Sequence, residues 1–109
     1  MIGFAAHRVY ILSDGTTHIC HMVRLDSQHH VTTIQPFSHE VHHTIWLDGV
    51  IVVSPIPIHT ILPNETISHL RSRYNASESN QEASLYAYHI SHIDYAEMRC
   101  TGESVATLL

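Results

Sequence analysis

The order of apolar and polar residues predicts β-strands along most of the chain. Residues 2–12 become β-prone toward their C-terminal end, and residues 17–25 alternate between two faces. A turn over 13–16 lies between them, so we expect the two segments to form a hairpin. Residues 29–35 predict a third, more polar strand, because β-branched side chains favour extended structure. Pro36 is expected to end that strand, since proline cannot donate to a strand ladder.

The middle of the chain predicts two more strands. Residues 44–47 are β-prone, and Asp48-Gly49 is a dipeptide typical of a tight hairpin turn. Residues 50–53 form an uninterrupted β-branched run of the kind that is buried on both faces of a sheet. We therefore expect the stretch from 44 to 53 to be a hairpin in the sheet core.

The second half of the chain predicts helices as well as a strand. Apolar residues at helical spacing indicate a short amphipathic helix over 65–74, with Asn64 as its N-cap. Residues 84–93 return to a strand pattern. Residues 102–108 are expected to form a final short helix, capped by Thr101.

Together these elements predict an all-β domain. The 109 residues are expected to form a single antiparallel β-sandwich or barrel, with one short inserted helix and a short C-terminal helix. Residues 1–54 supply the N-terminal strands, residues 55–83 the helix and a loop, and residues 84–109 the returning strand and the last helix.

The charge balance excludes some partners. The chain has no lysine, five arginines and ten carboxylates, which give a net charge of −5 with its twelve histidines neutral. A nucleic-acid partner is not expected, because nothing supplies a basic stripe. A membrane partner is not expected either, since no apolar run approaches the roughly 20 residues of a membrane span. The first twelve residues lack the order of a signal peptide, so the expected location is cytoplasmic.

One stretch suggests metal chemistry. Residues 39–43, His-Glu-Val-His-His, match the H-E-x-x-H pattern, in which two histidines on one helix face bind zinc and the glutamate polarises water. The stretch runs directly into β-prone residues, and a strand would separate His39 from His43 by about four rises of ~3.3 Å. The peptidase match is therefore expected to be accidental. His39, His42 and His43 remain the candidate metal ligands, for adventitious Zn²⁺ or Ni²⁺ rather than for a resident cofactor.

Other residues with chemical potential are expected to be structural. The pairs His18-x-x-His21 and His89-x-x-His92 are not expected to converge, because residues i and i+3 of a strand point to opposite faces. Cys20 and the second cysteine, Cys100, stand in no C-x-x-C motif and are expected to be small buried apolar residues. No catalytic nucleophile is identified.

Residues 44–52, Thr-Ile-Trp-Leu-Asp-Gly-Val-Ile-Val, resemble the N-terminal part of the amidohydrolase superfamily, in its cytosine/guanine-deaminase-like and chlorohydrolase-like branch. The resemblance implies a small β-sandwich, built from both ends of the chain, around an inserted metal-binding barrel. The segments that also resemble the family's sandwich strands and tail are 4–12, 20–26, 29–34, 85–94 and 96–108.

The metal site of that family is not matched. Its strand after the glycine ends in Gly-Phe-x-x-x-His-x-His, whereas here Ser54 and Pro55 replace Gly-Phe. His59 falls at the first metal position and Ile61 at the second. A (β/α)8 barrel needs about 200 residues or more, and only residues 55–84 separate the matching ends. The resemblance thus implies the composite sandwich domain alone.

Three functions follow as hypotheses. The leading one is a non-catalytic structural or protein-interaction module. It is expected to form a homodimer or a higher oligomer, or to bind another protein, because surface uncovered by the missing barrel needs a helix or a partner to cover it. The alternative is a histidine-rich module that binds metal or responds to pH. The third is a small zinc hydrolase that uses His39, Glu40 and His43.

The histidine content generates a first prediction. Protonating all twelve histidines would move the net charge from −5 to +7. The twelve histidines and five arginines would then carry seventeen positive charges against ten carboxylates. The reversal is centred near pH ~6.5, where histidine titrates. Light scattering across mildly acidic pH should therefore show a sharp change in self-association or solubility. A flat profile through that range would contradict the prediction.

Overall fold

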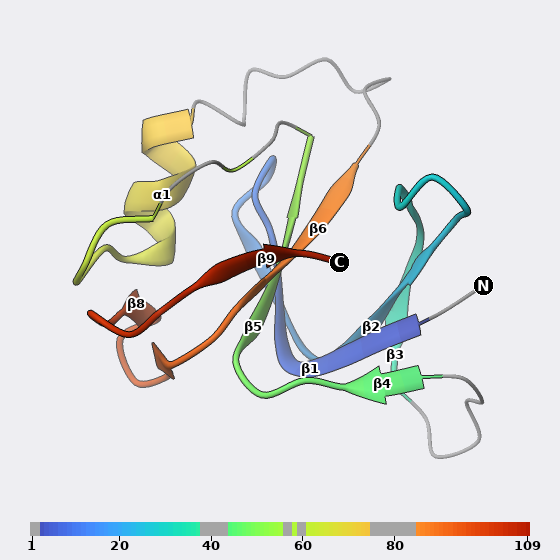
Figure 1. Cartoon of the computed structure of the whole chain (residues 1–109), viewed down its shortest axis with the longest axis horizontal. Helices are drawn as coiled ribbons and strands as arrows, with labels where there is room; N and C mark the ends of the chain where they lie inside the picture. Colours follow the sequence, from blue (N-terminus) through green and yellow to red (C-terminus); the bar gives the residue numbers. More distant parts are fainter. Residues whose placement is uncertain (1–2, 38–43, 56–57, 59–60, 75–84) are drawn as a thin grey trace.

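The computed structural model describes residues 3–37, 44–55, 58, 61–74 and 85–109. Within these residues the chain forms nine strands and one helix, and the predicted all-β class with a single inserted helix is confirmed (Figure 1). The elements follow one another in this order: β1 (Gly3–Ile11), β2 (Thr16–Leu25), β3 (Val31–Pro36), β4 (Thr44–Trp46), β5 (Val50–Ser54), α1 (Ile67–Tyr74), β6 (Tyr86–Ile90), β7 (Ile93–Asp94), β8 (Arg99–Cys100) and β9 (Ala106–Leu108).

The main sheet is mixed rather than antiparallel. Seven of the described strands join it in the order β3-β2-β1-β5-β6-β9, and β4 also pairs with β1. The predicted hairpin of β1 and β2 is present, with β3 antiparallel to β2. However, β4 and β5 both run parallel to β1. The strands β7 and β8 form a separate small hairpin.

The predicted hairpin at Asp48-Gly49 is wrong, because β4 and β5 are successive partners along one edge of β1 instead of partners of each other. Trp46 pairs with Ala5 and Val50 pairs with Arg8, so the segment that joins β4 to β5 has one more residue than the segment of β1 beside it. Gly49 lies in that joint with φ 103°. The extra residue lets β4 and β5 follow β1 around a bend.

The bend lies at His7. Ala6 and Val9 face the same buried cluster although they are three residues apart. The regular alternation of inward-facing and outward-facing residues is therefore broken between them. The ladder between β1 and β2 is regular on either side but skips His7 and Cys20. Cys20 has a left-handed backbone, with φ 52°. An irregularity on both strands thus turns the hairpin sharply at one level (Figure 1).

The sheet curls until its ends meet. His30, just before β3, forms an antiparallel bridge with Tyr86 at the start of β6. The amide of Val31 also donates to the carbonyl oxygen of Leu85 over 2.8 Å. These contacts close the path β3-β2-β1-β5-β6 into a small barrel.

The core has two parts, one on each face of β5, as its β-branched run predicted. Ile51 and Val53 face the inside of the barrel, and Val50 and Val52 face outward toward α1. All four are fully buried, and burial of each such side chain contributes roughly 1.5–3 kcal/mol. The inner cluster also contains Ala6, Val9, Val23, Leu25 and Ala87. The outer cluster also contains Tyr10, Leu12, Ile58, Ile67, Leu70, Tyr88, Ile90, Ile93 and Cys100.

The predicted C-terminal helix is wrong. Ala106 and Leu108 instead belong to β9, which pairs with Ile90 and Tyr88 of β6. Without β9, the outer edge of β6 would present unpaired backbone groups. Pairing with this edge outweighs the weak helical propensity of so short a segment. The tail therefore completes the sheet.

The inserted helix starts later than predicted. Its N-cap is Thr66, whose hydroxyl accepts a hydrogen bond from the amide of His69 over 3.1 Å. Asn64 is not the cap, since it takes a left-handed conformation with φ 63°. Buried Ile67 and Leu70 hold α1 on the outer face of the sheet. Within the described residues, no helix is long and apolar enough to cross a membrane.

The joint between β4 and β5 generates a stability prediction. Gly49→Ala should destabilise the protein by about 2–4 kcal/mol, because a positive φ disfavours alanine and its Cβ would overlap the carbonyl oxygen of Ile90. Gly102→Ala is the matched control, since nothing lies within 4 Å of its Cβ position. Urea unfolding of both variants checks this. Equal stability of the two would contradict the account of the joint.

Candidate functional site

The predicted metal ligands cannot be placed. His39, Glu40, His42 and His43 lie outside the described residues, as does His59. The zinc hydrolase and the adventitious metal site at these residues therefore stay predictions.

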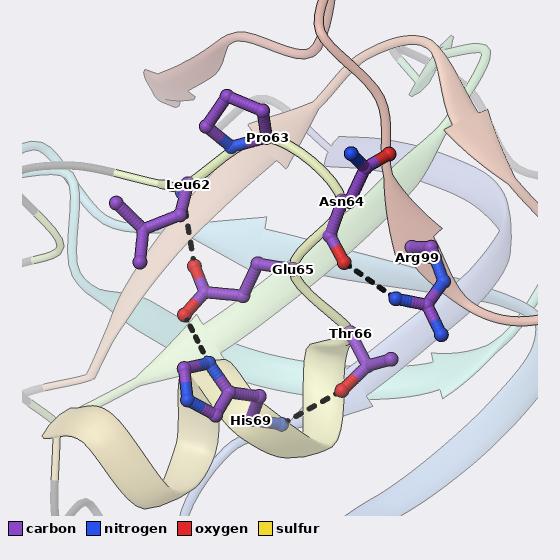
Figure 2. Close-up of a pocket in the computed structure, with 7 residues that line it drawn as sticks. All are labelled: Leu62, Pro63, Asn64, Glu65, Thr66, His69 and Arg99. Carbon is purple, nitrogen blue, oxygen red and sulfur yellow. Dashed lines mark hydrogen bonds and ion pairs between the residues drawn. The ribbon is translucent and has the colours of Figure 1, made fainter.

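One candidate site surrounds a buried carboxylate. Figure 2 shows Glu65 pointing back under the loop that leads into α1, beside a cavity of about 370 Å³. Its side chain is only 1% exposed. The amide of Leu62 donates to Oε1 over 3.1 Å, and Nδ1 of His69 donates to Oε2 over 2.7 Å. Arg73 donates from Nε to Oε2 over 2.7 Å and from Nη2 to Oε1 over 3.0 Å.

These donors decide the charge of Glu65. Burial by itself raises the pKa of this carboxyl, but the Arg73 guanidinium, the Leu62 amide and His69 outweigh it and hold the pKa below its ordinary value of 4.5. A carboxylate that is ionised and bonded at both oxygens is a poor general acid. We therefore interpret Glu65 as a structural anchor for α1.

The same loop fixes the β7–β8 hairpin. The carbonyl oxygen of Glu65 accepts from the amide of Cys100 over 2.7 Å, and Nη1 of Arg99 donates to the carbonyl of Asn64 over 2.6 Å (Figure 2). Burial and the negative charge of Glu65 raise the pKa of the Cys100 thiol. That thiol stays protonated, which removes it as a nucleophile.

A second candidate site lies at the bend, where aromatic rings gather on the surface. The ring of His7 meets Trp46 edge-on at a centroid distance of 4.8 Å and Tyr95 at 6.3 Å. The ring of Phe37 also contacts Trp46, at a centroid distance of 5.6 Å. A hollow of about 330 Å³ joins His7 and Tyr95 to Ile19. We call these five residues the corner patch.

Three large apolar or aromatic side chains of the corner patch are exposed. Ile19 is 63% exposed, Trp46 41% and Tyr95 36%. The expectation that the whole stretch 44–53 is core is thus wrong for its first half. The reason is that β1 is the only described strand that pairs with β4, so the side chains of β4 lie at the rim of the described sheet.

Tyr95 ties the patch to the joint behind it. Its hydroxyl accepts from the amide of Gly49 over 2.7 Å and donates to the carbonyl of the same residue over 3.0 Å. A cavity of about 470 Å³ opens here between Trp46, Tyr95, His89 and His92. His89 is not free, because its Nε2 donates to the carbonyl oxygen of Asp48.

Beside the patch lies an arginine with an unmet donor. Nε of Arg8 is buried and has no hydrogen-bond partner among the described residues. Arg8 lines the same hollow as Ile19.

Two expectations about chemically reactive residues are wrong. Cys20 is exposed, not buried. The rings of His18 and His21 do converge, with centroids 5.0 Å apart. Both results come from the left-handed backbone of Cys20, which breaks the strict alternation of β2. Even so, no group of three or more metal-binding side chains occurs within the described part of the chain.

Sequence reasoning missed the corner patch because Trp46 stands in a β-prone run that resembled a core strand. The usable signal was the shortness of that run before Asp48-Gly49, which is typical of an edge strand. The ion pair of Glu65 with Arg73 carried a weaker signal, since the two residues are eight apart and only one lies within the helix.

Comparison with protein-family models, with curated proteins and with solved structures found no match. The resemblance to the amidohydrolase composite domain therefore stays a prediction.

The buried anchor generates a stability prediction. Glu65→Gln should lower the free energy of unfolding by about 3 kcal/mol, because it removes the buried negative charge that pairs with Arg73. Glu97→Gln is the matched control, since the Glu97–Arg99 pair is exposed on both sides and should contribute less than about 1 kcal/mol. Urea unfolding at neutral pH measures both.

The contribution of Glu65 should also depend on pH. Because its pKa is lowered on folding, the stabilisation is fully present above about pH 4.5 and is lost as the pH falls through the folded value. The stability gap between wild type and Glu65→Gln should therefore be constant above that pH and shrink below it. This difference isolates Glu65 from Asp26, whose pKa is also lowered, by amides of His30 and Gln28. A gap that widens in acid would contradict the assignment.

Proposed function

We propose that this chain is a non-catalytic protein-interaction module that forms a homodimer through the corner patch. The observation that carries the proposal is the continuous exposed cluster of Ile19, Tyr95 and Trp46, joined by His7 at the bend of the sheet. Tryptophan and tyrosine are enriched at the energetic centres of protein interfaces.

The backbone beside the patch supports the same function. Among the described strands, β4 pairs only with β1, so it is an edge strand of the described sheet. Ile45 next to Trp46 is 49% exposed. An apolar strand edge is a ready template for another chain. Side chains and backbone thus offer a partner contacts at one place.

Symmetry makes a second copy the proposed partner. In a twofold dimer the corner patch of one copy would meet the same patch of the other. Each copy would then cover the exposed Ile19 and Trp46 of its partner.

The proposal includes descent from an amidohydrolase-like sandwich without its barrel. It is supported by the way β6 returns antiparallel to β5 after the 55–84 segment, so that both halves of the chain share one sheet. It is also supported by α1, which covers the outer face of that sheet through Ile67 and Leu70.

The dimer is tested by light scattering coupled to size-exclusion chromatography over a range of concentrations. Trp46→Ser should weaken self-association about thirtyfold, the effect of losing roughly 2 kcal/mol at an interface hot spot. Leu62→Ser is the matched control, because Leu62 is 46% exposed but lies beside the Glu65 cavity, away from the patch. Circular dichroism establishes that both variants are folded.

Two results would contradict the proposal. A wild-type chain that stays monomeric at high concentration would remove the homodimer. A dimer weakened equally by Trp46→Ser and Leu62→Ser would remove the corner patch as its interface.

A further inference from the structure

Two histidines of β2 share one face of the sheet, against the alternation expected of a strand. His18 lies opposite Val9 and His21 lies opposite Ala6 in the ladder with β1. Both of those partners face the inner cluster, because the bend changes the parity between them. Directly opposed residues in an antiparallel ladder project to the same side. The two imidazoles are therefore neighbours, with centroids 5.0 Å apart and ring planes inclined by 45°.

Hydrogen bonds fix which nitrogen of His21 is free. Its Nδ1 lies 2.8 Å from the carbonyl oxygen of Ile19. A carbonyl oxygen only accepts, so Nδ1 carries the hydrogen and Nε2 keeps its lone pair. A backbone carbonyl in this role is the usual outer partner of a metal-binding histidine.

Two hydrogen bonds through Thr16 fix which nitrogen of His18 carries the hydrogen. The hydroxyl of Thr16 donates to Oδ1 of Asp14 over 2.7 Å, since an ionised carboxylate has no hydrogen to give. The hydroxyl oxygen is then left to accept, and Nε2 of His18 lies 3.2 Å away. His18 therefore carries its hydrogen on Nε2 and keeps its lone pair on Nδ1.

The ring spacing matches what one cation requires. A metal–nitrogen bond of about 2.0–2.1 Å places each ring centroid about 3.2 Å from the ion. Two imidazoles bound at an angle between 90° and the tetrahedral value then have centroids about 4.5–5.2 Å apart. The observed separation of 5.0 Å falls within that range.

We propose that His18 and His21 form a two-histidine site for a borderline divalent cation such as Zn²⁺, bound through Nδ1 of His18 and Nε2 of His21. Imidazole nitrogens suit Zn²⁺, Ni²⁺ and Cu²⁺. Within the described residues no third metal-binding side chain joins the pair, so water completes the coordination. Both proposed ligands lie outside the corner patch, and Ile19 of the patch contributes only its backbone carbonyl oxygen. The site does not depend on the proposed dimer.

The test is a Zn²⁺ titration of the tag-free chain by isothermal calorimetry. His18→Gln and His21→Gln should each abolish one equivalent of binding. His69→Gln should leave that equivalent unchanged, because His69 is held by Glu65 and no other histidine of the described residues lines its cavity. The long-range ¹H–¹⁵N spectrum should show Zn²⁺ shifting Nδ1 of His18 and Nε2 of His21.

The outer partner gives a readout that non-specific surface binding would not move. Thr16→Val removes the hydroxyl that orients His18 and should weaken this equivalent about tenfold. Thr17→Val, the adjacent exposed position on β2, should leave it unchanged. The site is refuted if all equivalents survive both histidine substitutions, or if Zn²⁺ shifts the opposite ring nitrogens.

Discussion

The bend of β1 at His7 is the constraint on which the rest of the structure depends. The strand β1 pairs with β2 along one edge and with both β4 and β5 along the other. It can do so only because the partner segment carries an extra residue at Gly49, and because the ladder with β2 skips Cys20. Without the bend, the sheet would not curl far enough for the bridge between His30 and Tyr86 to close it.

Closing the barrel leaves the outer face of β5 to be covered, and a short helix does this work. An eight-residue helix has little stability of its own. It is held from one side by apolar packing and from the other by two charged anchors. Arg73 binds buried Glu65, and Arg71 donates from Nε to the carbonyl of Leu12 over 2.8 Å. We therefore interpret the buried carboxylate of Glu65 as an anchor that holds the helix on the sheet.

Both proposed binding features arise at the bend. On one side of the hairpin, the rim position of β4 leaves Trp46 on the surface beside His7. On the other side, the parity change brings His18 and His21 together. A regular, flat sheet of the same sequence would bury the first group more deeply and separate the second. The irregular backbone thus gives rise to both of the binding features that we propose.

The sequence by itself determined the strands β1 to β6, the inserted helix and the burial of the run in β5, because these depend on local propensity and on side-chain periodicity. It did not determine which strands pair. The Asp48-Gly49 joint is locally indistinguishable from a hairpin turn, and only the bent edge of β1 makes it a step between parallel partners.

Tertiary context also decided the chain end and the histidines. Residues 106–108 become β9 because β6 has an edge to fill, which no local pattern records. His18 and His21 follow a simple rule of alternation until the left-handed backbone of Cys20 breaks it. Local sequence sets what each segment can be, whereas long-range pairing sets which side chains finally meet, because hydrogen-bonded edges form between segments far apart in the chain.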